Sequence, residues 1–167
     1  FEPGGIDHSV HGGSFTTAKE ISREIFDFDP PIYQFYDWIS IKGGEAFSSS
    51  TGNSMTLKEV GEIYEPGVLR YLFVGSKPKS HFNISFDNDV IKIYEDFDQL
   101  EKRYFEGNLN PKKKRDYEVS IVDIPKKMPE RVGFRHLVTL VQINDLKGLS
   151  KYDLKRIEKV KNWLEKY

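Results

Sequence analysis

Residues 42–53 read Lys-Gly-Gly-Glu-Ala-Phe-Ser-Ser-Ser-Thr-Gly-Asn and separate a predicted strand from a predicted helix. The run of hydroxyl side chains supplies small hydrogen-bonding groups, and the glycines let the backbone approach a ligand closely. Hydroxyls and backbone N–H groups arranged in this way can contact phosphate oxygens. Serine- and glycine-rich runs are more often solvated surface connections, so this alternative stays open on composition alone.

The residues before this loop predict an α/β arrangement. Residues 1–8 (FEPGGIDH) have the pattern of a buried strand that ends in a glycine turn, and residues 34–41 (QFYDWISI) are aromatic and β-branched, as strands are. Thr17 and Glu20 have the spacing of a capping box, which predicts a helix from Thr17 to about residue 26.

The residues after the loop predict helices instead. Thr56 and Glu59 form a second capping box, and Pro66 stands where a further short helix would begin. Apolar residues recur at spacings of three and four over residues 89–104, as on one face of a helix. Residues 134–143 (FRHLVTLVQI) read as a buried helix.

A last helix and two connecting segments complete the expected order. Ser150 and Asp153 cap a helix whose apolar side is expected to contain Leu154, Ile157, Val160 and Leu164. Residues 108–115 are expected to form a loop, and residues 117–124 an edge strand or an extended link. The predicted fold class is the remnant of an α/β domain followed by a mainly α-helical region.

Composition limits the classes of function. The 167 residues carry 25 basic and 26 acidic side chains, so the chain is no polycation, although a local basic patch remains possible. With no cysteine, the chain has no disulfide framework, no thiolate zinc site and no cysteine nucleophile, which fits a reducing compartment. No apolar run approaches the length that spans a bilayer.

A second candidate site lies at residues 4–14 (GGIDHSVHGGS), after the end of the first predicted strand. Ligands of open α/β sheets bind at such strand ends, and Asp7 and His8 could hydrogen-bond to a ribose or an ammonium group there. His8 and His11 also have a metal-ligand spacing, but no third ligand lies near them in the sequence. A tight turn that only satisfies backbone groups is the alternative.

A third candidate is basic. Lys112, Lys113, Lys114 and Arg115 could contact phosphates, and the aromatic residues Tyr104, Phe105 and Tyr117 lie near them in the sequence. A solvated loop is the alternative. The sequence contains neither a recognisable Ser/His/Asp triad nor the G-x-x-x-x-G-K-[ST] motif.

Together these residues resemble a known family. Residues 46–53 (AFSSSTGN) are similar to the KMSKS signature loop of class I aminoacyl-tRNA synthetases. Gly5-Ile-Asp-His8, followed by Gly12-Gly-Ser14, resembles class I lysyl-tRNA synthetases in particular, as do residues 94–105, 134–142 and 162–167. The similarity runs over essentially the whole chain, so it outweighs any single motif.

The resemblance implies a lysine–tRNA ligase, a cytoplasmic enzyme of translation whose partners are ATP with Mg²⁺, lysine and tRNA(Lys). Such an enzyme makes lysyl-adenylate and transfers the lysyl group to the tRNA. The catalytic loop positions would be Ser48, Ser49, Ser50, Gly52 and Asn53. The ATP and adenylate site would include Gly5, Asp7, His8, Ala46 and Phe47. His8, Phe35 and Tyr36 are candidates for contact with the substrate lysine, and residues 112–115 for contact with tRNA.

The loop departs from the signature, because Ala46 and Ser49 stand where the two lysines are expected and Thr51 where a third basic residue is common. Mg²⁺ or lysines from elsewhere would have to supply that charge. The other class I signature, the HIGH-type motif, is absent from the sequence. The resemblance therefore implies an internal piece of a synthetase, inactive by itself.

The implied organisation has three parts. Residues 1–60 would end a Rossmann-like catalytic domain, residues 61–130 would form a stem-contact region, and residues 131–167 would begin a helical anticodon-binding domain. Two alternatives stay open: another class I synthetase, such as a glutamyl-tRNA synthetase, and a tRNA-binding module that has lost its chemistry.

Overall fold

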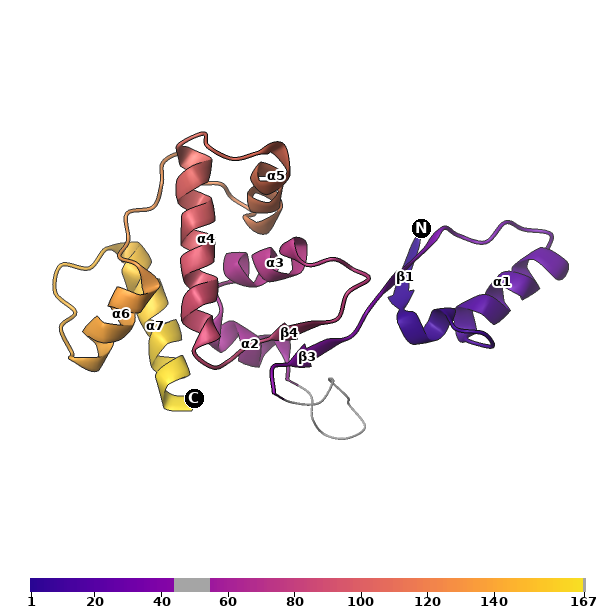
Figure 1. The fold of residues 1–167 in the computed structure, drawn as a ribbon, viewed down its shortest axis with the longest axis horizontal. Coiled ribbons are helices and arrows are strands. Elements are labelled where there is room, and N and C mark those ends of the chain that lie inside the picture. Colours follow the sequence, from indigo (N-terminus) through magenta and orange to yellow (C-terminus); the bar gives the residue numbers. More distant parts are fainter. Residues whose placement is uncertain (44–54, 167) are drawn as a thin grey trace. The chain divides into compact units, whose positions relative to one another are not determined.

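The computed structural model describes residues 1–43 and 55–166, which fall into two compact units. The first unit takes residues 1–43 and 76–84, and the second takes residues 55–75 and 85–166. Each unit is described by itself. The elements of both are labelled in Figure 1.

The first unit begins with a strand–helix–strand segment. Strand β1 (Glu2–Gly5) leads into a short 3-10 helix, η1 (Ile6–Ser9), then α1 (Ser14–Glu24) and β2 (Tyr33–Tyr36). The two strands are parallel, with Glu2 opposite Tyr33 and Gly5 opposite Tyr36. A strand that ends in a glycine turn is therefore present, because the chain turns at η1 directly after β1. The expectation that this strand is buried was wrong, since Glu2 and Pro3 are exposed and Gly4 and Gly5 are only half-buried.

Helix α1 starts earlier than predicted. Its first residue is Ser14 and its N-cap is Gly13, whose carbonyl accepts hydrogen bonds from Thr17 N at 3.0 Å and from Thr16 Oγ1 at 2.8 Å. The start predicted at Thr17 was wrong, because Thr17 already lies in the first turn. The helix also ends at Glu24 rather than near residue 26, and none of its residues is buried.

The single strand predicted over residues 34–41 is two strands in two sheets. Strand β2 ends at Tyr36, and β3 (Ile39–Ile41) pairs in parallel with β4 (Phe82–Ile84), a strand that was not predicted. Between them, the Asp37 carboxylate accepts a hydrogen bond from Trp38 N at 2.7 Å, and Asp37 N donates to Pro78 O at 2.8 Å. These bonds divert the chain from one sheet to the other.

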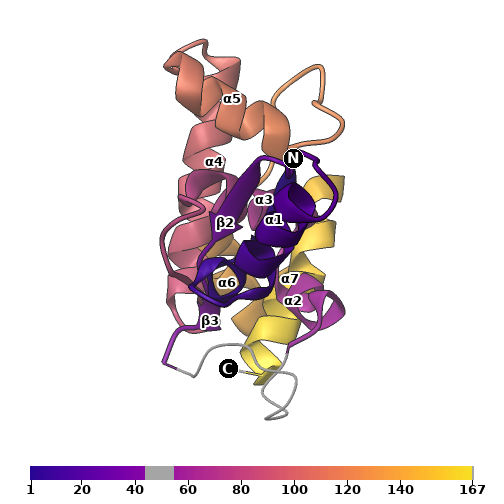
Figure 2. The same cartoon turned by 90° about the vertical axis from the view of Figure 1, so that its right-hand side faces the viewer.

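The second unit contains six helices among the described residues, and five of them were predicted with their type and approximate position. They are α2 (Leu57–Ile63), α3 (Pro66–Gly75), α4 (Asp89–Phe105), α6 (Phe134–Gln142) and α7 (Lys151–Lys166). The capping box of α2 is present, with Glu59 N bonded to Thr56 Oγ1 at 3.3 Å and Thr56 N bonded to Glu59 Oε2 at 2.7 Å. In Figure 2, α5 (Pro111–Ser120) lies across the C-terminal end of α4.

Helix α5 corrects two predictions, a loop at residues 108–115 and an edge strand or extended link at residues 117–124. Asn110 caps the helix, since its Oδ1 accepts a hydrogen bond from Lys113 N at 2.8 Å, and Pro111 occupies the first turn. Asparagine followed by proline is a good helix start, because proline needs no N–H there. Residues 117–120 belong to the helix, and residues 121–124 form no strand.

The last helix, α7 (Lys151–Lys166), begins at its predicted cap, where Ser150 N donates to Asp153 Oδ2 at 2.8 Å. Its buried face was only partly predicted. Leu154 and Leu164 are 58% and 36% exposed, whereas Ile157 and Val160 are buried. The buried face of α7 also includes Asp153, Arg156 and Trp163. The apolar pattern missed this face because two of its members are charged.

Tyr94 lies at the centre of the second unit. Its ring stacks on Phe134 with centroids 3.8 Å apart, and both residues are fully buried. The Tyr94 hydroxyl donates to Ile63 O at 2.8 Å and accepts from Glu65 N at 2.9 Å, so it fixes the corner between α2 and α3. Burial raises the pKa of Tyr94 well above its usual range, which keeps the hydroxyl protonated.

A buried ion cluster joins α4 and α7. Arg156, which is fully buried, donates two hydrogen bonds of 2.8 Å to the Asp98 carboxylate and one of 2.8 Å to Glu65 Oε2. Arg131 bonds to Asp98 at 3.0 Å and also to Glu101, whose other oxygen accepts from the buried Tyr117 hydroxyl at 2.9 Å. Each charged side chain of this cluster therefore has an oppositely charged partner.

At this level the fold agrees with the predicted order of an α/β part and a mainly helical part. The first unit has short parallel strands with one helix between β1 and β2, and the second is helical in its regular elements. No helix within residues 1–43 and 55–166 is long and apolar enough to cross a membrane.

Candidate functional site

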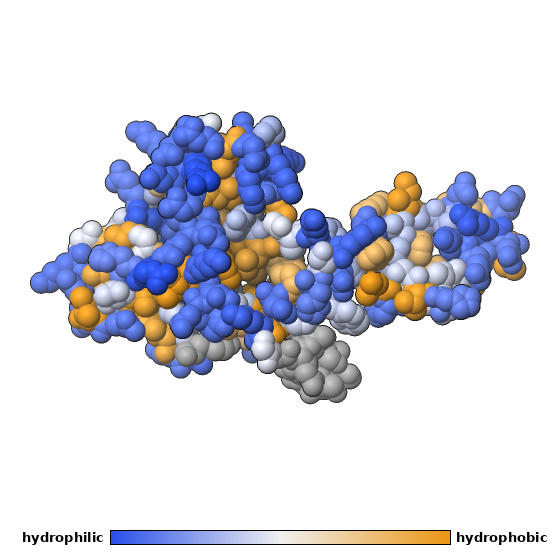
Figure 3. All heavy atoms as spheres, viewed as in Figure 1, coloured by the Kyte–Doolittle hydropathy of each residue, from blue (hydrophilic) through white to orange (hydrophobic). Residues whose placement is uncertain are grey.

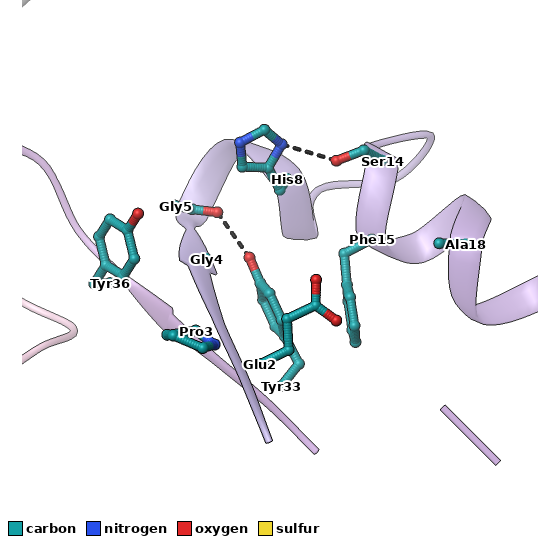
Figure 4. A pocket seen from close by; sticks show the side chains of 10 residues that line it. All are labelled: Glu2, Pro3, Gly4, Gly5, His8, Ser14, Phe15, Ala18, Tyr33 and Tyr36. Atoms are coloured by element: carbon teal, nitrogen blue, oxygen red, sulfur yellow. Dashed lines mark hydrogen bonds between the residues drawn. The ribbon is translucent and has the colours of Figure 1, made fainter. Parts of the chain in front are cut away.

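A cavity of about 410 Å³ runs along β1 and β2 and reaches His8 and Ser14 beyond the C-terminal end of β1 (Figure 4). Its walls come from β1, η1, the start of α1, and β2. They are formed by Glu2, Pro3, Gly4, Gly5, His8, Ser14, Phe15, Ala18, Tyr33 and Tyr36. The volume lies within the range of small-molecule sites, roughly 300–1,000 Å³. Ligands of open parallel sheets bind at this end of the strands.

One wall of the cavity is a stacked aromatic pair. The rings of Phe15 and Tyr33 lie with centroids 3.9 Å apart, and the Tyr33 hydroxyl donates to Gly5 O at 2.9 Å. Gly4 is required for this packing, because a Cβ there would lie 2.5 Å from the Tyr33 hydroxyl oxygen. Desolvation and then the charge of Asp7 raise the pKa of Tyr33, so its hydroxyl acts as a donor.

The His8 imidazole is held at the cavity by the start of α1. Its Nδ1 lies 2.8 Å from Ser14 Oγ, a bond drawn in Figure 4. Ser14 is the first residue of α1, so the position of the ring depends on where that helix begins. The side chain is exposed, and its second ring nitrogen can donate or accept a hydrogen bond.

The comparisons with known proteins agree on one family. The family described as "tRNA synthetases class I (K)" matches residues 1–124, which include the whole cavity. The chain belongs to the class I lysyl-tRNA synthetases.

Relatives from distant organisms support this assignment. A lysine–tRNA ligase from Borreliella burgdorferi is 48% identical over 95% of this chain and 32% of its own length. Those from Treponema pallidum and Thermococcus kodakarensis are 43% and 33% identical, over 86% and 100% of this chain and 29% and 37% of their own lengths. The chain spans about a third of the length of these ligases.

The cavity of this synthetase chain unites three of the predicted site residues, Gly5, His8 and Tyr36. Asp7 is exposed and does not line it. Phe35 lies outside it as well, and its ring is covered by the Lys79 ammonium at 4.8 Å from the centroid. The predicted loop residues Ala46, Phe47, Ser48, Ser49, Ser50, Gly52 and Asn53 lie outside the described residues.

Several lining residues were not predicted as site residues, Phe15 and Tyr33 among them. Their pairing joins α1 to β2 and leaves no pattern in the sequence. Ser14 belonged to the quoted glycine-rich segment, but its bond to His8 follows from the unexpected helix start. In the described part of the chain, no group of three or more His, Cys, Asp or Glu residues could hold a metal ion, so His8 and His11 gain no third ligand.

The predicted tRNA contacts, residues 112–115, lie on α5 rather than on a loop. Lys113 lies 3.2 Å from Asp116, and Lys114 and Arg115 lie 3.9 and 3.8 Å from Glu118. Because successive helical residues point about 100° apart, the four cations do not form one continuous strip. Their expected stacking partner Tyr117 is fully buried and packs on Tyr104, with ring centroids 4.4 Å apart.

Proposed function

We propose that the chain supplies part of the lysine and ATP site of a lysine–tRNA ligase, together with part of its tRNA-binding surface. The lysine carboxylate attacks the α-phosphorus of ATP, and pyrophosphate leaves. The 2′-hydroxyl of the terminal adenosine of tRNA(Lys) then takes the lysyl group and releases AMP. The family match over residues 1–124 carries this proposal, because it contains the cavity at the end of β1.

In this proposal the first unit belongs to a Rossmann-like nucleotide-binding domain. Gly5 and His8 contact the adenylate, and the exposed Asp7 carboxylate accepts hydrogen bonds at the open side. His8 and Tyr36, which both line the cavity, contact the substrate lysine, and Phe35 does not. The Phe15–Tyr33 wall keeps the pocket open, and the Ser14 hydroxyl sets the orientation of His8.

The loop of residues 46–53 contacts the phosphates of MgATP through hydroxyl and amide groups. Because the loop has no lysine, the Mg²⁺ that enters with ATP carries more of the charge that develops on pyrophosphate. Residues 1–60 would end the catalytic domain, residues 61–130 would contact the tRNA stem, and residues 131–167 would begin the anticodon-binding domain. Such an enzyme of translation would work in the cytoplasm.

A chimaera tests this function. Residues 1–167 replace the matching segment of the Borreliella burgdorferi ligase, and ATP–pyrophosphate exchange is measured with lysine and with glutamate. We expect exchange with lysine only, and a large loss of kcat/KM in the His8→Ala variant. His11→Ala is the matched control, since His11 lies two residues beyond η1 and does not line the cavity.

Exchange that depends on glutamate would overturn the substrate assignment. Normal tRNA binding without exchange in the chimaera would indicate a module that has lost its chemistry. Equal kinetics for His8→Ala and His11→Ala would remove His8 from the site.

A further inference from the structure

A second cavity, of about 310 Å³, lies between α3, α4 and α5 in the second unit. Tyr71 of α3 and the buried Leu100 of α4 form an apolar side of it. Gln99, Arg103 and Lys113 provide polar groups. The cavity therefore combines an apolar side with an amide, two cations and the carboxylate of Asp96.

The surrounding segment is strongly basic. Residues 102–115 contain six cations and a single acidic residue, Glu106, in a chain that is nearly neutral as a whole. The side chain of Arg103 is exposed and has no ion pair among the described residues. Figure 3 shows hydrophilic residues over α5 and the adjoining end of α4, with hydrophobic residues visible between them. Such a surface suits a polyanion.

The cavity residues of α4 are arranged along one side of that helix. Asp96, Gln99 and Arg103 follow one another at spacings of three and four, which places them on the same face. With a rise of 1.5 Å per residue, Asp96 and Arg103 are about 10 Å apart along the helix.

Lys113 completes the cationic end of the cavity. Its ammonium lies 5.7 Å from the centroid of the Tyr71 ring and 3.2 Å from Asp116 Oδ2. Asp116 is buried, and its Oδ2 forms no hydrogen bond of good geometry, so the aspartate holds the lysine electrostatically at the cavity wall. Of the four cations at residues 112–115, only Lys113 lines this cavity.

We propose that this cavity binds one nucleotide of the tRNA. Arg103 and Lys113 contact its phosphate, the base lies against Tyr71 and Leu100, and Gln99 and Asp96 bond to the base edge or a ribose hydroxyl. The inference rests on the proposed tRNA ligase function and moves the centre of RNA contact from residues 112–115 to the space between α4 and α5. Arg103, which sequence reasoning had not singled out, becomes the main phosphate contact.

The test compares two neighbouring cations. Arg103→Ala removes the proposed contact, whereas Lys102→Ala removes the same charge from an exposed side chain that pairs with Glu106 at 3.9 Å and does not line the cavity. Binding of a labelled tRNA(Lys) transcript to the 167-residue chain is measured by fluorescence anisotropy over a salt series. Both variants are first checked for an unchanged urea midpoint, which excludes misfolding.

We expect Arg103→Ala to weaken binding roughly tenfold, as for one lost bond to a charged group, and Lys102→Ala by less than about threefold. The slope of log K against log salt should fall by about 0.7–0.9 in the Arg103 variant, the value of one phosphate contact. In a second arm, AMP should shift the NMR signals of Tyr71 and Gln99 more than adenosine or inorganic phosphate does.

Equal effects of the two variants would overturn the cavity site and leave tRNA binding itself intact. AMP binding at the cavity without an effect of Arg103→Ala on tRNA affinity would also overturn it, since the cavity would then serve free nucleotides. Failure of the unaltered chain to bind tRNA at any salt would instead contradict the tRNA surface of the proposed function and this inference together.

Discussion

Replacing Arg156 with alanine removes the centre of the buried ion cluster that joins α4 to α7. The substitution takes away three charge-assisted hydrogen bonds, two to Asp98 and one to Glu65. Removing one partner of a buried ion pair costs about 3–5 kcal/mol, because the remaining charge is left uncompensated. The side chains of Glu65 and Asp98 are 26% and 22% exposed, and Asp98 keeps Arg131, which favours the lower end. We therefore expect the free energy of unfolding to fall by about 3 kcal/mol.

Trp163 reports on this loss. It is 6% exposed and its Nε1 donates to Phe86 O at 2.8 Å, so its emission should shift to the red when the second unit unfolds. The sequence has two tryptophans, and Trp38→Phe leaves Trp163 as the sole reporter. With a urea slope of about 1–3 kcal/mol per molar, the midpoint should fall by roughly 1–3 M.

Two further variants separate the cluster from surface charge in general. Arg156→Lys keeps the charge and loses the fork that binds Asp98 with two nitrogens, so its midpoint should lie between those of the unaltered chain and Arg156→Ala. Arg135→Ala is the matched control, since Arg135 makes a similar two-bond pair with Glu95 but is 67% exposed. A midpoint for Arg156→Ala no lower than that for Arg135→Ala would refute the reasoning.

Three other substitutions test separate parts of the fold. Burial raises the pKa of Glu101 more than Arg131 lowers it. The protonated Glu101 side chain therefore stabilises the fold below the pKa of the unfolded chain, which is about 4.3, and this stabilisation is lost as pH rises through the pKa of Glu101 in the folded state. The urea midpoint of the unaltered chain relative to Glu101→Gln should therefore decline from pH 4 upward, and a constant difference would contradict this. Gly4→Ala should force Tyr33 away from Phe15 and Gly5 and lower the free energy of unfolding by about 1–3 kcal/mol. The near-ultraviolet circular dichroism signal should weaken, and an unchanged signal would show that the Phe15–Tyr33 wall accommodates the added methyl group. Thr56→Ala should cost about 1 kcal/mol by removing the cap of α2, and Thr56→Ser, which keeps the hydroxyl, should recover most of it in the same urea titration.

Local signals in the sequence were sufficient where one turn of chain decides the structure. The capping boxes at Thr56 and Ser150 and the apolar stripe of α4 gave the right helices. Local signals failed where two of them competed. At residues 110–115 the asparagine–proline start outweighed the run of like charges, because acidic residues three and four positions onward neutralise most of that run.

Long-range contacts account for the rest. Strand β4 has three residues, and its partner β3 lies about 40 positions earlier in the sequence. No local sequence pattern therefore predicted β4. Arg156 is buried because of Asp98 and Glu65, which are 58 and 91 positions away. At the candidate site, the glycine-rich segment contains Gly5 and His8, which line the cavity, but the stacked wall of the cavity depends on the meeting of α1 and β2.

The lone pairing of β1 with β2 has a consequence for how the chain behaves in concentrated solution. Among the described residues neither strand has a second neighbour, so each presents one edge of backbone N–H and C=O groups, interrupted in β1 by Pro3. In the same unit, Ile25, Phe26 and Phe28 after α1 are 71%, 71% and 66% exposed. Open strand edges are templates for adding a strand from another molecule, and exposed apolar side chains favour association further. We therefore expect the isolated chain to self-associate through the open strand edges of its first unit at high concentration.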